Sequence, residues 1–106
     1  MSESIQQIKA EFFKALAHPA RIRILEVLTE RESSVSELIP EVGLESSHLS
    51  QQLAVLRRAN LVVTRKSGNN VYYRLADRRI AKILNLAKQI LLDYLTNTRD
   101  QLAEVQ

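Results

Sequence analysis

A chain of 106 residues is the size of one compact domain, and a hydrophobic fraction of 45% with a charged fraction of 25% is ordinary for a folded protein. Two glycines and two prolines leave little turn chemistry, which favours helices over a many-stranded sheet. The sequence holds no cysteine, which excludes disulfides, thiolate metal ligands and thiol redox chemistry. A polar start and the lack of a long apolar run predict a cytoplasmic protein with one domain over residues 1–106.

The net charge of +3 is distributed unevenly along the chain. Residues 46–79 carry seven basic residues against Asp77 alone, whereas residues 1–45 are net acidic and residues 80–106 are balanced. A positive field confined to one third of the chain is typical of a DNA-facing surface. A solvated basic face explains the charge alone equally well.

Helical spacing begins at the N-terminus. Apolar residues such as Ile5 and Phe12 predict a first helix over residues 4–17. His18 and Pro19 break it, because proline disfavours helical geometry in the residue before it. Pro19 suits the first turn of a second helix that runs to about residue 31, and His18 is expected to cap or pack rather than bind a metal.

The next segment has the order helix, tight turn, helix. Ser34 and Glu37 form a capping-box pattern that opens a short third helix ending near residue 42. Gly43 can adopt the left-handed conformation of a tight turn. A fourth helix follows over residues 46–60, with leucines at positions 49, 53 and 56 on one stripe.

The periodicity then becomes alternating. Residues 61–65 and 71–75 are rich in β-branched and aromatic side chains and predict a two-stranded ribbon, with its turn over residues 66–70. Asp77 can cap a last helix that reaches about Ala103. That helix would be about 40 Å long, longer than so small a domain, and its apolar arc is too wide for one core. A homodimer is therefore expected, with an interface of Ile5, Ile8, Phe12, Ile83, Ala87, Ile90, Leu91, Tyr94 and Leu95.

The expected fold is mainly α with one β-hairpin: a dimeric winged helix-turn-helix with four helices, the ribbon and a fifth helix. The second helix of a helix-turn-helix, which here is the helix over residues 46–60, lies in the major groove of DNA. The polar face opposite the leucines holds the predicted contacts Ser46, Ser47, His48, Ser50, Gln51, Gln52, Arg57 and Arg58. The hairpin tip adds Arg65, Lys66, Asn69 and Asn70. Taken alone this tip is better explained as an ordinary hairpin turn, and its position after the polar helix favours DNA contact.

Three stretches in order, Phe13–Leu25, Leu49–Val62 and Val71–Leu75, resemble the ArsR/SmtB family of bacterial winged-helix regulators. The resemblance implies a homodimer joined through its first and last helices that binds an inverted-repeat operator and usually represses. Gln52 and Asn60 replace the His and Gly common in that family.

The sequence offers no motif for catalysis or for a cofactor, so an enzyme is not expected. Many relatives sense metals, but this chain has only His18 and His48 and a few scattered carboxylates, which predicts no transition-metal site. A winged helix used for protein contacts is the alternative, and it predicts an apolar or acidic fourth helix. The sequence does not identify an effector, which could be a small ligand or a separate sensor protein.

Overall fold

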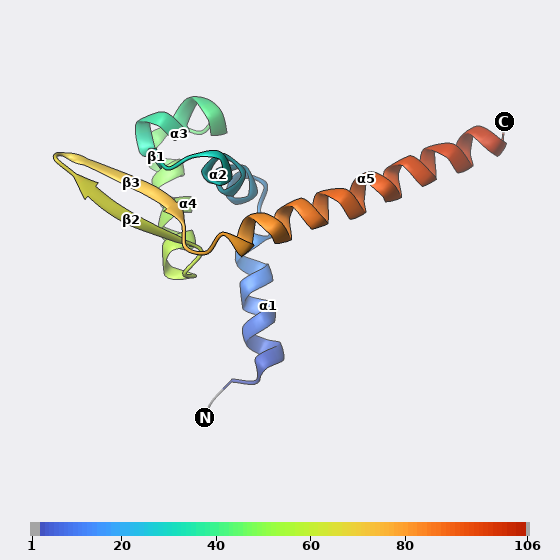
Figure 1. The fold of residues 1–106 in the computed structure, drawn as a ribbon, viewed down its shortest axis with the longest axis horizontal. Helices are drawn as coiled ribbons and strands as arrows, with labels where there is room; N and C mark the ends of the chain where they lie inside the picture. The colour runs from blue at the N-terminus through green and yellow to red at the C-terminus, as the bar shows by residue number, and fades with distance from the viewer. Residues whose placement is uncertain (1–2, 106) are drawn as a thin grey trace.

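The computed structural model describes residues 3–105 as five helices and one small sheet. In Figure 1, α2, α3 and α4 form a compact body, a β-hairpin projects from one side of it, and α1 and α5 extend away from it as separate rods. The elements in chain order are α1 (Ile5–Leu16), α2 (Pro19–Glu30), β1 (Ser33–Ser34), α3 (Val35–Val42), α4 (Ser46–Arg58), β2 (Val62–Ser67), β3 (Asn70–Leu75) and α5 (Arg79–Val105).

Side-chain caps set where the first three helices begin. Ser4 and Gln7 form a reciprocal capping box at the start of α1. His18 is the N-cap of α2, where its Nδ1 accepts a hydrogen bond of 3.1 Å from the backbone N–H of Ala20. The predicted capping role of His18 is therefore confirmed, and so is the capping box of Ser34 and Glu37 that opens α3.

The turns between α3, α4 and the hairpin rely on left-handed backbone. Gly43 ends α3 with φ of 78°, as its sequence position predicts. Asn60, just after α4, has φ of 61° and is the one residue other than glycine with positive φ in the described part of the chain. Asparagine tolerates this conformation better than most residues, which explains how a residue with a side chain can occupy this turn position.

The sheet is larger than the predicted ribbon. It has three antiparallel strands in the order β1-β3-β2, so the prediction of two strands was incomplete. The predicted five-residue turn was also wrong, because Lys66 pairs with Val71 and Ser67 with Asn70 in the ladder. Gly68 has φ of 62°, which permits a two-residue hairpin turn and lets both strands extend to it.

One core joins the body to the hairpin and to the near ends of α1 and α5. The leucine stripe of α4 is buried as predicted, with Leu49, Leu53 and Leu56 no more than 1% exposed. The remaining buried apolar residues come from α1, α2, α3, the hairpin with the residue before it, and the first turn of α5: Ala15, Leu16, Ile24, Leu25, Val27, Leu28, Leu38, Leu61, Val62, Leu75 and Ile80. Because this core fixes one side of α4, the opposite side of that helix is left for another partner.

Candidate nucleic-acid interface

The α3–turn–α4 unit presents one long, uncovered helix face. The exposed residues of α4 are Ser46, Ser47, His48, Ser50, Gln51, Ala54, Arg57 and Arg58. This set contains every predicted contact residue of the helix except Gln52. It also contains the small residue Ala54, which was not among the predicted contacts. Short polar side chains on an exposed helix allow close approach of a base edge, and Gln can bond adenine bidentately.

Gln52 faces the body of the protein. Its side chain is half-buried, and its Oε1 accepts a hydrogen bond of 2.8 Å from Nε of Arg21 on α2. Arg21 also donates from Nη1 to the backbone carbonyl of Ala15 at 3.3 Å. Gln52 thus ties α4 to the junction of α1 and α2. In this conformation its amide oxygen is engaged within the molecule.

The charge on α4 is positive and uncompensated. The helix holds no acidic residue, and Arg57 and Arg58 occupy its last turn. Within the described residues, neither guanidinium takes part in an ion pair. Cations at a helix C-terminus are also favoured by the helix dipole. The polar face therefore ends in two positive charges that can meet phosphates.

The hairpin tip is exposed from Arg65 to Asn70. Arg65 differs from the other predicted contacts, because Glu32 already holds it. One carboxylate oxygen of Glu32 accepts hydrogen bonds from Nε and Nη2 of Arg65 at 2.8 and 2.6 Å. The guanidinium carbon lies 4.8 Å from the centre of the Tyr72 ring. These hydrogen bonds lower the pKa of Glu32 below its usual value and raise that of Arg65.

Sequence reasoning did not identify Glu32 or Arg21 as partners of the predicted contact residues. Each lies more than thirty positions from its partner. Local periodicity carries no signal for such a pair. For Glu32, the one local feature is its position directly before the residues that form β1, Ser33 and Ser34.

The apolar sides of α1 and of α5 are also uncovered. Among the predicted interface residues, Ile90 is 60% exposed and Tyr94 is 64% exposed. Phe12 is half-buried against the core of its own chain and makes an edge-to-face contact of 5.4 Å with Phe13. The exposed large apolar residues of the two helices are Ile5, Ile8, Phe13, Ile83, Leu86, Ile90, Leu91, Leu92, Tyr94, Leu95 and Leu102. Large apolar side chains exposed in this number on two helices favour burial against a partner.

Two further findings concern metals and membranes. Among the described residues, no three or more His, Asp or Glu side chains gather in a way that could hold a metal ion. No helix in the described part of the chain has the length and apolar character to cross a membrane.

A helix-turn-helix whose second helix is polar and exposed, followed by a β-hairpin, defines a winged helix-turn-helix protein. Residues 18–64 match the family model for bacterial regulatory proteins of the arsR family. An uncharacterized HTH-type transcriptional regulator of Mycobacterium tuberculosis, Rv0081, is 56% identical over 97 residues, which cover 91% of this chain and 85% of that protein. A transcriptional repressor SmtB homolog of Synechocystis is 40% identical over 85% of this chain and 66% of its own length.

Solved structures agree with these sequence matches. The crystal structure of Rv0081 matches with a TM-score of 0.84 and 55% identity, over 92% of this chain and 98% of that one. The homodimeric winged helix-turn-helix DNA-binding domain of Mb0332 from Mycobacterium bovis matches with a TM-score of 0.79 and 27% identity, over 91% and 94% of the two chains. The chain belongs to the ArsR/SmtB family of bacterial winged helix-turn-helix transcriptional regulators.

Proposed function

We propose that this regulator acts as a homodimer that binds an inverted-repeat operator in duplex DNA and represses transcription from it. The observation that carries the proposal is the exposed face of α4, which is polar apart from Ala54, holds no acidic residue and ends in Arg57 and Arg58. Names of relatives, among them a biofilm growth-associated repressor of Xylella fastidiosa, support repression rather than catalysis.

The roles of individual residues follow from position on the helix and on the hairpin. The first turns of α4 supply the side chains for base edges: Ser46, Ser47, His48, Ser50 and Gln51. Arg57, Arg58 and Lys66 are assigned to phosphates, because their charges are free in the described structure. Asn69 and Asn70 lie at the exposed hairpin end, where they can follow the backbone or the minor groove.

Dimerisation is supported by the apolar face of α1 and α5. Two-fold symmetry would bury Ile83, Ile90, Leu91 and neighbouring side chains against their symmetry copies. It would also hold two α4 helices so that each can reach one half-site, about one helical turn of DNA apart. The homodimeric state of the Mb0332 domain supports the same arrangement.

Use of the fold as a protein-interaction module predicts an apolar or acidic α4, and this helix is neither. Binding of a selected inverted-repeat duplex and of a scrambled duplex can be compared by fluorescence anisotropy across a salt series. We expect the selected duplex to bind more tightly at every salt concentration, and both affinities to fall as salt rises. Equal affinity for the two duplexes would contradict sequence-specific regulation.

A further inference from the structure

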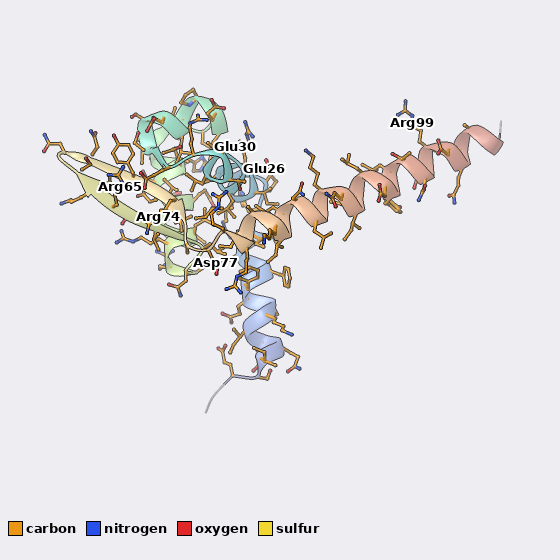
Figure 2. All side chains as sticks on the ribbon, in the orientation of Figure 1. Glu26, Glu30, Arg65, Arg74, Asp77 and Arg99 are labelled. Atoms are coloured by element: carbon orange, nitrogen blue, oxygen red, sulfur yellow. The ribbon has the colours of Figure 1, made fainter. Side chains whose placement is uncertain are left out.

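On the outer face of the sheet, side chains from β2, from β3 and from the residue before β1 are in contact. Tyr72 on β3 pairs with Ser34 of β1 on one side and with Arg65 of β2 on the other. Ser33 is completely buried, so side chains alternate and Glu32, just before it, lies on the outer face with Arg65. Figure 2 labels Arg65 and Arg74 on the hairpin, beside the segment that joins α2 to β1.

The contact between Glu32 and Arg65 spans this face. The carboxylate takes two N–H donors from one edge of the guanidinium, at 2.8 and 2.6 Å, while Tyr72 lies against the guanidinium plane at 4.8 Å. The positive charge of Arg74 adds to the stabilisation of the ionised carboxylate and helps to lower the pKa of Glu32. The side chain of Glu32 is 28% exposed and that of Arg65 is 49% exposed, so solvent only partly screens the pair.

This pairing changes what Arg65 can offer to DNA. A guanidinium whose Nε and Nη2 are already on a carboxylate forms a locally neutral pair, and a phosphate would have to displace Glu32 to use the same edge. Lys66, the next residue, has no ion-pair partner among the described residues. The pair also links the hairpin to the body beyond β1, which contributes only two residues of pairing to β3.

We propose that Glu32 is a specificity-determining residue of this regulator: it withholds the charge of Arg65 from non-specific phosphate contact and fixes the hairpin relative to α4. The inference rests on the proposed DNA-binding function. Specific binding requires the base-reading helix and the hairpin to meet one duplex together, whereas non-specific binding requires only positive charge. A device that neutralises one charge and restrains the hairpin lowers the second kind of binding relative to the first.

The test measures affinity for selected and scrambled duplexes between 50 and 200 mM salt, by anisotropy on the full chain. Glu32→Gln keeps the side-chain size but frees Arg65 for one more phosphate. We expect the slope of log affinity against log salt to steepen by about 0.9, which is a gain in affinity about three- to fourfold larger at 50 mM than at 200 mM salt. The ratio of selected to scrambled affinity should fall. Glu32→Asp, which retains the carboxylate, should restore part of that ratio.

Three further variants separate this role from general electrostatics. Glu30→Gln removes an exposed carboxylate from α2 without freeing Arg65, so the slope and the ratio should stay at wild-type values. Arg65→Ala should leave the slope unchanged, because Arg65 makes no phosphate contact while Glu32 holds it. The double variant Glu32→Gln with Arg65→Ala should lose the steepened slope. Thermal melts followed by circular dichroism check that each variant is folded.

Two results would overturn the inference. A slope that becomes shallower by about 0.9 in Arg65→Ala alone would show that Arg65 contacts a phosphate directly. An unchanged ratio in folded Glu32→Gln would show that Glu32 has no part in specificity. Failure of the wild-type protein to prefer the selected duplex would instead contradict the proposed function, so the two failures are distinguishable.

Discussion

Gln51 and Ser50 lie on the part of α4 that no other element of the described structure covers. Replacing either with alanine should reduce discrimination between the selected duplex and a duplex with one altered base pair by about 1–3 kcal/mol, because each removes hydrogen-bonding groups suited to base edges. Lys66→Ala is the matched comparison. It should weaken binding to all duplexes alike, since a phosphate contact carries no sequence information. Competition anisotropy measures both effects, and a change of preference in Lys66→Ala alone would reverse the assigned roles.

Substitution of Asn60 tests the contribution of the left-handed backbone angle in the turn between α4 and β2. Its φ of 61° is in the left-handed region, where a side chain with a Cβ is strained and glycine is not. Asn60→Ala should lower the free energy of unfolding by about 1 kcal/mol, because alanine lacks the short polar group that eases this conformation. Asn60→Gly should be close to neutral. Urea denaturation measures the pair, and an equal loss in both variants would show that the asparagine side chain matters more than its backbone angle.

At the scale of single elements, the start of α5 is held by Asp77, two residues before Arg79. Oδ1 of Asp77 accepts a hydrogen bond of 2.8 Å from the backbone N–H of Arg79, and Oδ2 accepts one of 2.7 Å from its Nη2. The predicted capping role of Asp77 is confirmed by this contact. Hydrogen bonds from the side chain and backbone of Arg79 lower the pKa of Asp77 from 3.8 to about 2. The ionised carboxylate therefore stabilises the folded state above about pH 4, and the effect is lost as the pH falls through about 2.

Asp77→Asn should thus have a lower melting temperature than wild type at pH 7, and the difference should shrink between about pH 4 and pH 2. Asp77→Ala should lose more at pH 7, since asparagine can still accept the backbone hydrogen bond and alanine cannot. Circular dichroism melts at pH 7, 4, 3 and 2 measure both. A difference that stays constant down to pH 2 would show that the carboxyl group contributes only through its shape.

At the scale of the whole molecule, the exposed large apolar residues lie on α1 and α5. These two helices extend away from the body as separate rods in Figure 1. Each isoleucine or leucine that loses its remaining exposure to water contributes about 1–2 kcal/mol, and a two-fold axis counts each residue twice. Ile90→Glu should therefore dissociate the proposed dimer. Light scattering should report the wild type at twice the chain mass of 12.1 kDa and the variant at that mass.

Gln89→Glu provides the control, since it introduces the same charge at an exposed neighbouring position that is outside the proposed interface residues and about 100° around the helix from Ile90. It should remain dimeric. Dissociation should also weaken operator binding, because two half-sites must be engaged together. A monomeric wild-type protein at micromolar concentration would contradict the proposed interface.

The sequence by itself determined the features that depend on neighbouring residues. Capping patterns at Ser34 and at His18 with Pro19 located the helix starts, and Gly43 located the tight turn. The leucine period of α4 identified its buried stripe and, by exclusion, its polar face. The apolar arc of α5 is wider than the core of one chain requires. This width identified the surface of α5 that the body does not cover. Each of these patterns is complete within a few residues, because a helix cap or one turn of a helix involves only neighbouring positions.

Only the tertiary structure decided which side chains meet across the fold. The strand β1 is two residues long and exists because Ser33 and Ser34 pair with Tyr73 and Tyr72, far along the chain. The partners of Gln52 and Arg65 also depend on packing and on sheet register rather than on local pattern. From the charge count alone, Arg65 was one of the positive groups expected to be free for DNA. The register of the three strands instead brings its guanidinium to the carboxylate of Glu32. Since a contact between distant residues is set by how whole elements pack, no short stretch of sequence encodes it.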